Sequence, residues 1–274
     1  MELLTSANKQ LEQLQAIMNT DTVMNLSKDT SLKVGVDLGT SSIVLVVLDQ
    51  NDRPVFGAFE YANAVRDGLV VNYRESVDVV KRLKERAENC LGRTLVKAAG
   101  AVPPGTIGNN KRVVENVIES AEMESGAIID EPTAAASLIG LQEGAVVDVG
   151  GGTTGISVFK KGEVIYTADE PTGGTHMTLV LAGYYGISVA DAEKQKRLQV
   201  DASSNFLIMR PVVEKMAEIT RRHLVECPST PIYIVGGATA YTQFLETFRS
   251  YLKADVFQPV FPQYVTPMGI AMNG

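Results

Sequence analysis

The sequence predicts an α/β protein built from a duplicated unit. From residue 33 onward, short runs rich in β-branched residues alternate with amphipathic helical patterns, as in folds where helices cover a mixed sheet. A scheme of strand, Asp-x-Gly turn, strand, turn and strand occupies residues 33–59 and occurs again at 144–168. This recurrence indicates an internal duplication, and therefore two lobes of similar construction.

The composition excludes several classes of function. Of the 274 residues, 45% are hydrophobic, which is enough to bury a core without disulfides. The net charge of -7 argues against broad binding to nucleic acid or to anionic lipid, because both need a basic surface. Cys90 and Cys227 have no CxxC spacing, so neither a disulfide framework nor a zinc site is expected.

Residues 1–30 precede the first strand and differ from the rest. The stretch has neither the basic start nor the apolar core of a secretory signal, and no apolar run in the chain approaches the roughly 20 residues of a membrane-spanning helix. We therefore expect a cytoplasmic protein without membrane contact. Leu11, Leu14, Ile17 and Met18 lie at helical spacing, which predicts a helical extension and linker. The helix either packs on the body of the protein or serves as a docking peptide.

Residues 31–144 are expected to form the first lobe, and residues 145–274 the second. In the first lobe we predict helices where apolar residues fall on one face, and a buried strand where an apolar run stops at two prolines. The expected elements after residue 59 are a helix at 76–91, a strand at 98–102, a helix at 112–124, a strand at 126–130 and a helix at 132–139. In the second lobe, after residue 168, they are helices at 189–197, 211–225, 241–251 and 266–272 and a strand at 232–235. The last helix is a candidate to pack back on the first lobe.

Two turns of the duplicated scheme share a design that suits phosphate binding. In each turn an aspartate ends a strand, glycines let the backbone approach a phosphate, and hydroxyls add donors. The aspartates can hold the water molecules around Mg²⁺. Either turn alone is explained equally well as an ordinary hairpin closure, but two such tips facing each other would clamp the phosphates of ATP. The candidates are Asp37, Gly39, Thr40 and Ser41 in one turn and Asp148, Gly150, Gly151, Gly152, Thr153 and Thr154 in the other.

Glu131 lies between the two turns, in the run "DEPTAAASLIG". A carboxylate at the start of a helix can accept a hydrogen bond from a water molecule and direct it at a terminal phosphate. The alternative is a residue that only caps the helix or faces solvent. The small residues that follow Glu131 allow close helix packing.

A third glycine turn, at Gly236 and Gly237, follows the predicted strand at 232–235. The two glycines would let the backbone lie flat against a ribose or a purine. By itself this signal is weak, because a strand–Gly–Gly–helix junction is common in α/β proteins.

Together these motifs resemble those of the actin-like ATPases, a superfamily that includes DnaK-type chaperones, bacterial actin homologues and sugar kinases. "DLGTSS", "EPTAAA", "DVGGGTT" and "VGGAT" occur in the order of that superfamily's phosphate, connecting, phosphate and adenosine motifs. Within it, the segments "VRDGLVVNY", "VPPGT", "TGGTHMTL", "VEKMAEI" and "TPMGIAM" resemble the EutJ family of ethanolamine-utilisation proteins. This similarity covers nearly the whole chain after residue 30.

The resemblance implies two duplicated ribonuclease-H-like domains around a cleft that holds ATP or ADP with Mg²⁺. It implies Asp37, Asp148 and Glu131 as catalytic or metal-holding residues, and Glu193 and Lys196 as adenosine contacts opposite Gly236. Glu193 would bind the ribose, and Lys196 or Arg197 would stack beside the base. An exposed charged helix face explains the run "DAEKQKR" equally well. The implied role is chaperone-like assistance to ethanolamine-utilisation enzymes or to shell proteins of their microcompartment.

The chain also departs from the superfamily pattern. Gly155 stands where the chaperones carry an acidic residue, so hydrolysis is expected to be slow or absent even if ATP binds. A nucleotide-responsive scaffold with little hydrolysis is therefore an alternative function, and a small-molecule kinase is a weaker one. His176 follows a glycine pair near the expected cleft, where it either binds phosphate or makes a structural hydrogen bond. His223 is expected to face solvent.

Overall fold

The computed structural model describes residues 2–27, 29–66, 68–106 and 108–274, with side chains from residue 4. Two five-stranded mixed sheets run in the orders β3-β2-β1-β6-β7 and β10-β9-β8-β11-β12. A two-stranded ribbon, β4-β5, lies apart from both sheets. The strands are β1 Leu32–Leu38, β2 Ser42–Asp49, β3 Pro54–Tyr61, β4 Val65–Arg66, β5 Leu69–Val70, β6 Lys97–Val102, β7 Glu124–Asp130, β8 Gly144–Val149, β9 Thr154–Lys160, β10 Glu163–Glu170, β11 Ile232–Val235 and β12 Val256–Phe257.

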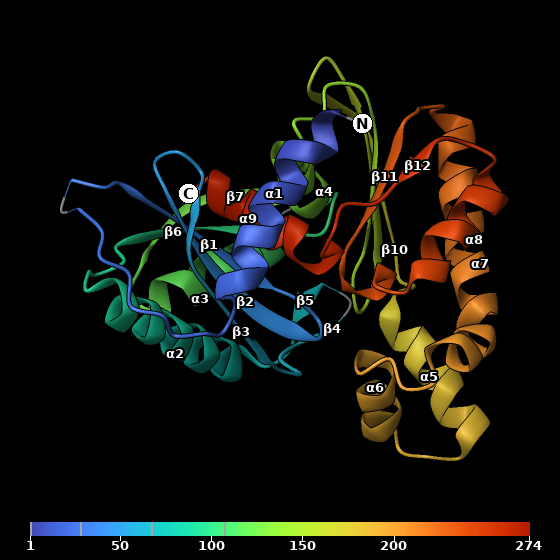
Figure 1. The fold of residues 1–274 in the computed structure, drawn as a ribbon, viewed down its shortest axis with the longest axis horizontal. Coiled ribbons are helices and arrows are strands. Elements are labelled where there is room, and N and C mark those ends of the chain that lie inside the picture. Colours follow the sequence, from blue (N-terminus) through green and yellow to red (C-terminus); the bar gives the residue numbers. More distant parts are fainter. Residues whose placement is uncertain (1, 28, 67, 107) are drawn as a thin grey trace.

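The two sheets have the same topology, which confirms the predicted duplication. In each, three consecutive strands form an antiparallel meander, and the first strand of the meander pairs in parallel with a later strand: β1 with β6, and β8 with β11. We call the elements around the first sheet lobe I and those around the second sheet lobe II. The lobes lie side by side, with lobe II coloured from yellow-green to orange (Figure 1).

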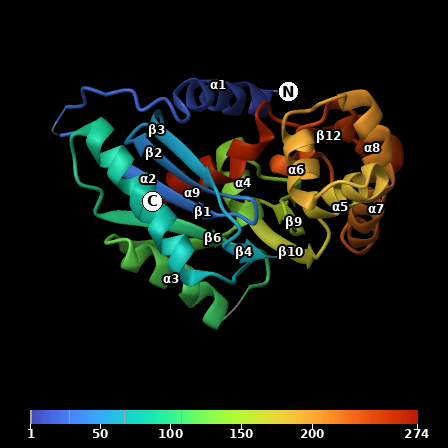
Figure 2. The same ribbon diagram turned by 90° about the horizontal axis from the view of Figure 1, so that it is seen from below.

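Helices cover both sheets (Figures 1 and 2). In lobe I, α2 and α3 pack on one face, and in lobe II, α5, α7 and α8 pack on the outer face. The helices are α1 Glu2–Ile17, α2 Tyr73–Leu91, α3 Asn109–Ser120, α4 Glu131–Ile139, α5 Gly174–Tyr185, α6 Val189–Arg197, α7 Ala202–Glu226, α8 Thr242–Leu252 and α9 Val265–Met272, with short 3-10 turns at Gly237–Thr239 and Pro262–Tyr264. No helix within the described ranges is long and apolar enough to cross a membrane.

Helices α4 and α9 fill the space between the two sheets. Their apolar side chains share one core with residues of β2 in lobe I and of β8, β9 and β11 in lobe II. Helix α9 follows lobe II in the sequence yet contacts β1, β2 and β6 of lobe I. The floor of the interlobe space is therefore a continuous apolar core.

Helix α1 lies on this same core. Leu11 and Leu14 are fully buried in it, and Asn8 Oδ1 accepts a hydrogen bond of 3.0 Å from the Val260 amide. Just after α1, the Asn19 amide bonds to the Gly57 carbonyl of β3 at 2.8 Å. The amphipathic N-terminal helix is thus packed on the body of the protein.

Two predicted helices differ most from those observed, and the others agree within three residues at each end. Helix α3 spans Asn109–Ser120 instead of 112–124, because Glu122 takes a left-handed conformation with φ 63° and the next strand starts at Glu124. Helix α7 starts at Ala202, so Pro211 lies inside it. An internal proline costs about 3 kcal/mol, but Phe206, Met209, Val213 and Met216 continue one buried face through the proline. Burial of that face outweighs the cost.

Candidate functional site

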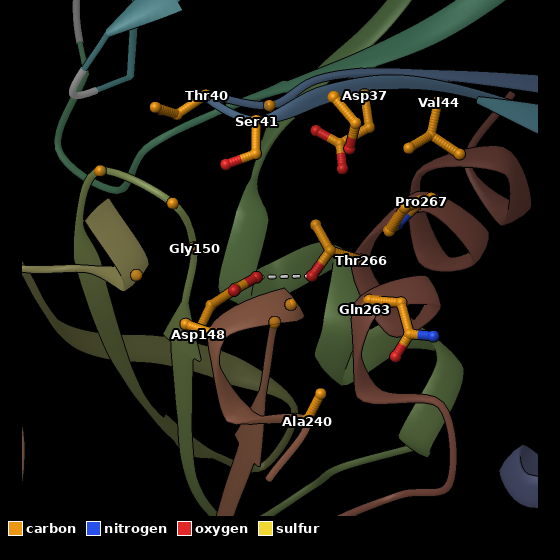
Figure 3. A pocket seen from close by; sticks show the side chains of 18 of the residues that line it. Asp37, Thr40, Ser41, Val44, Asp148, Gly150, Ala240, Gln263, Thr266 and Pro267 are labelled. Carbon is orange, nitrogen blue, oxygen red and sulfur yellow. Dashed lines mark hydrogen bonds between the residues drawn. The ribbon is translucent and has the colours of Figure 1, made fainter. Parts of the chain in front are cut away.

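A cleft between the lobes collects nearly all the residues singled out by the sequence. It is lined by the turn between β1 and β2, the turn between β8 and β9, the start of α4, the end of α6, the turn after β11 and the start of α9. The lining residues among the candidates are Asp37, Gly39, Thr40, Ser41, Glu131, Asp148, Gly150, Gly151, Gly152, Thr153, Glu193, Lys196, Gly236 and Gly237. Figure 3 shows Asp37 and Ser41 on one wall and Asp148 and Gly150 on the other.

Among the candidates in the two glycine turns, Thr154 lies outside the cleft lining. Its side chain is fully buried, and its hydroxyl donates a hydrogen bond of 2.6 Å to the Thr172 carbonyl. Thr154 therefore ties the second turn to the segment before α5.

The two glycine turns approach each other closely. A Cβ added to Gly151 would lie 2.6 Å from Ser41 Oγ and 3.2 Å from Thr40 Cβ, so a larger residue would force the Ser41 or Thr40 side chain to move. The carbonyls of Gly150 and Gly151 accept hydrogen bonds of 2.9 and 2.8 Å from the amides of Gly174 and Thr175. The N-terminus of α5 thus fixes the second turn from behind.

Three carboxylates face this region from three different elements. Burial, and then the charge of Asp148, raise the pKa of Asp37 to about 7. Burial raises the pKa of Asp148 to about 6, although a hydrogen bond of 2.5 Å from Thr266 Oγ1 opposes the shift (Figure 3). Burial and the charges of Asp148 and Asp37 raise the pKa of Glu131 well above its ordinary value. Such mutual repulsion favours a bound cation.

The carboxylates do not form a direct metal cage. Within the described part of the chain, no three His, Cys, Asp or Glu side chains are grouped closely enough to hold one ion. Any ion between Asp37 and Asp148 would therefore keep water molecules in its coordination shell, as Mg²⁺ commonly does.

The titration of Asp37 predicts an unusual pH dependence of stability. Because the folded-state pKa of about 7 lies above the ordinary aspartate value of 3.8, the protonated carboxyl stabilises the nucleotide-free fold. That stability is fully present below about pH 4 and is lost as the pH rises through 7. The variant Asp37→Asn does not titrate, so its stability advantage over the wild type in thermal unfolding should grow by about 3 kcal/mol between pH 5 and pH 8. A difference in stability between the two proteins that is constant over this pH range would contradict a raised pKa of Asp37 in the folded state.

On the side of the cleft predicted to bind adenosine, α6 carries a compact ionic cluster. Glu193 Oε2 lies 2.8 Å from Lys196 Nζ, and Glu193 Oε1 lies 2.7 Å from Arg197 Nε. Burial acts to raise the pKa of Glu193, but Lys196, a hydrogen bond from Thr178 and Arg197 together outweigh burial and lower it. Lys196 Nζ also donates to the Gly174 carbonyl at 2.8 Å. Lys196 therefore links α6 to the start of α5. Arg197, which is also paired with Glu193, lies at the rim of the cleft.

The conformation and surroundings of Gly236 explain why the third turn has glycine at this position. Its φ of 94° is a conformation that disfavours L side chains, and an added Cβ would lie 2.4 Å from both Asp148 Oδ1 and the Val149 carbonyl. The turn after β11 is thus packed against the aspartate of the second glycine turn. This contact joins the side of the cleft predicted to bind adenosine to the side predicted to bind phosphate.

The structure adds cleft residues that the sequence did not single out. Thr266 holds Asp148, and Val44, Phe59, Tyr61 and Pro267 give lobe I and α9 an apolar wall. Thr266 and Pro267 belong to the segment "TPMGIAM", which carried the family resemblance, but no local pattern indicated that these two residues would line the cleft. Asp169 of β10 pairs with Gly155 in the sheet register, and its charge raises the pKa of Asp148 and Glu131.

The two histidines lie outside the cleft lining. His176 Nδ1 accepts a hydrogen bond of 3.3 Å from the Gly173 amide at the start of α5. The prediction that His223 faces solvent is wrong. Its Nδ1 lies 2.7 Å from the Tyr166 hydroxyl and its Nε2 lies 3.0 Å from Glu170 Oε1. Strand β10 lies against this end of α7, which the helical pattern alone does not reveal.

Comparison with known proteins places the chain in a family. It is 40% identical over 247 residues to the ethanolamine utilization protein EutJ of Escherichia coli (strain K12), covering 90% of this chain and 87% of that protein. The chain belongs to the EutJ family of ethanolamine-utilisation proteins. The EutJ protein of Salmonella typhimurium is also 40% identical, over 249 residues that cover 90% of this chain and 88% of that protein. The family predicted from the sequence motifs is confirmed.

Solved structures confirm the actin-like fold. The crystal structure of EutJ from Carboxydothermus hydrogenoformans superposes with a TM-score of 0.93 at 43% identity, covering 99% of both chains. The structure of MreB 5 of Spiroplasma citri bound to AMPPNP gives a TM-score of 0.71 at 15% identity, covering 89% of this chain and 96% of that one. The family profile of the cell division protein FtsA matches residues 145–269, which lie in lobe II. This EutJ-family chain is thus built on the fold of the actin-like ATPases.

Proposed function

We propose that the chain binds ATP or ADP with Mg²⁺ in the interlobe cleft. The observation that carries the proposal is the convergence of two glycine turns, from opposite lobes, on the same space as the carboxylates and the α6 cluster. Gly151 and Ser41 approach so closely that backbone amides and hydroxyls from both lobes can reach one phosphate chain. The AMPPNP-bound and ADP-bound MreB 5 structures share this fold and support a nucleotide as the ligand.

The residues present fit a magnesium ion. Asp37 and Asp148 supply hard oxygen atoms, and burial raises the pKa of both carboxyls, so a nearby positive charge would stabilise their ionised forms. Bound Mg²⁺ would supply charge neutralisation for the phosphates. Among the described cleft residues the cations are Lys196 and Arg197, and both are paired with Glu193. We therefore expect nucleotide binding to depend strongly on the metal.

Glu131 is the candidate to position the attacking water. It opens α4, whose N-cap Asp130 accepts a hydrogen bond of 3.0 Å from the Thr133 amide, so the backbone at Glu131 is fixed. A general base must be ionised, and the raised pKa of Glu131 opposes ionisation until a cation offsets the neighbouring charges. Slow hydrolysis is therefore expected.

A scaffold with little hydrolysis is favoured by one specific contact. At Gly155 an added Cβ would lie 3.1 Å from Pro104 and 3.5 Å from Pro132, so the fold leaves little space for a carboxylate there. The two functions share the nucleotide site and differ in turnover. In an ATPase switch, hydrolysis would change the closure of the lobes and so the affinity for a partner.

We propose ethanolamine-utilisation enzymes or their microcompartment shell proteins as the partners, in a chaperone-like role. Membership of the EutJ family supports this setting. Purified candidate partners should be retained by the immobilised protein to different extents with Mg-ATP, with Mg-ADP and with no nucleotide. Equal retention in the three conditions would speak against a nucleotide-controlled role.

The binding proposal is tested by isothermal titration of ATP and ADP, each with Mg²⁺, into the wild type. Phosphate release is then followed on the same samples, with Glu131→Ala as the control. Binding with turnover well above the control supports the switch, and binding with turnover equal to the control supports the scaffold. Absence of binding by the wild type would refute both.

A further inference from the structure

One contact joins the two lobes at the rim of the cleft. The Arg197 guanidinium of α6, in lobe II, lies over the ring of Tyr61 at the end of β3, in lobe I, with its carbon 3.8 Å from the ring centroid. Both residues line the cleft, and Tyr61 is 60% exposed. A cation over an aromatic face at this distance is attracted by the ring quadrupole. The pair therefore opposes separation of the lobes at the point where a ligand enters.

Each partner of this contact is held in place by its own lobe. Arg197 is oriented by Glu193 at 2.7 Å, and Tyr61 is packed edge-on against Phe59 with ring centroids 5.3 Å apart. A preorganised pair loses less side-chain entropy on contact than two freely rotating side chains do.

The contact is also connected to both phosphate turns. In lobe I, Tyr61 pairs with Ser42 in the sheet register, and the Ala62 amide donates a hydrogen bond of 3.4 Å to the Ser41 carbonyl. In lobe II, Arg197 is linked through Glu193 and Lys196 to the Gly174 carbonyl, and the Gly174 amide bonds to Gly150. Opening at the rim and loosening of the phosphate turns are thus mechanically coupled.

We propose that Tyr61 and Arg197 form a latch that holds the lobes closed at the rim and slows release of the nucleotide. This inference rests on the proposed nucleotide site, and it assigns to that site a regulation of exchange. Release requires the lobes to part, so the energy of the latch adds to the barrier for dissociation. A partner that displaced either side chain would accelerate exchange without touching the nucleotide.

The test compares three variants in stopped-flow release of a fluorescent ADP analogue with Mg²⁺. Tyr61→Ala removes the ring and should raise the release rate about threefold to tenfold, the range expected for one partly exposed cation–π contact. Tyr61→Phe keeps the aromatic face, so its release rate should stay within about twofold of the wild type. Tyr184→Ala removes a tyrosine that is 69% exposed on α5 and does not line the cleft, and it should have no effect.

A second readout does not depend on the nucleotide. Nitroxide labels at Glu85 on α2 and Ser250 on α8, both exposed, report the distance between the lobes by pulsed electron paramagnetic resonance in a Cys227→Ser background. Tyr61→Ala should shift the nucleotide-free distances toward longer values, and Tyr61→Phe should not. If the wild type fails to bind nucleotide, the proposed nucleotide site is refuted, and the interlobe distances alone test whether Tyr61 and Arg197 hold the lobes together. Unchanged distances together with an unchanged release rate would overturn the latch proposal.

Discussion

Replacing Asp148 by asparagine is expected to lower the affinity for Mg-ATP by about 10-fold to 100-fold. The substitution keeps the shape of the side chain and an oxygen that can accept from Thr266, but removes the charge that we propose faces the hydrated metal. Titration calorimetry of ATP with Mg²⁺ and with excess chelator separates the metal-dependent part of the affinity from the part that does not depend on the metal. Without metal, the variant should bind ATP no worse than the wild type, because one repelling carboxylate is gone.

The same variant should be more stable than the wild type in the absence of nucleotide. The pKa of Asp148, raised by burial to about 6, shows that its ionised form is disfavoured in the fold at neutral pH. Asp78→Asn, on the exposed face of α2, is the matched control and should change neither affinity nor melting temperature appreciably. A loss of Mg-ATP affinity that was equal in chelator, or a lowered melting temperature, would argue for general structural damage.

Replacing Gly269 by alanine is expected to lower the free energy of unfolding by about 2 to 4 kcal/mol. An added Cβ would lie 1.8 Å from the Ala134 carbonyl oxygen and 2.4 Å from its carbon, so α9 would have to move away from α4. Because this helix pair belongs to the core between the sheets, the displacement would spread to both lobes. Chemical denaturation monitored by circular dichroism measures the loss.

Gly183 provides the control for this experiment. It also lies within a helix, α5, but nothing is within 4 Å of an added Cβ. Gly183→Ala should therefore stabilise the protein by up to about 1 kcal/mol through helix propensity and lower unfolded-state entropy. Opposite signs for the two variants would establish that the close approach of α9 and α4, and not helix propensity, governs position 269. Similar small gains at both positions would refute the packing argument.

Features that are local or repeated could be predicted from the sequence alone. Two Asp-x-Gly turns in equivalent schemes predicted the duplicated sheets, since a hairpin tip needs only neighbouring residues to form. Helix α6 was predicted with its observed bounds, Val189–Arg197, and Ser188 caps it by accepting a hydrogen bond of 3.1 Å from the Asp191 amide. Glycine in both turns also indicated close backbone approach, as the contact of Gly151 with Ser41 illustrates.

Contacts between distant segments could not be predicted from the sequence and follow from the packing of the whole chain. Thr266 meets Asp148 across 118 residues, and Tyr61 meets Arg197 across the cleft, with no periodicity linking either pair. Helix α7 runs through Pro211 because a buried face, and not local propensity, sets its length. Hydrophobic pattern and turn chemistry specify which elements form, but the partners of each face are chosen by packing of the whole chain. The raised pKa values of the cleft carboxylates likewise arise only when two strands and a helix, β1, β8 and α4, bring them together.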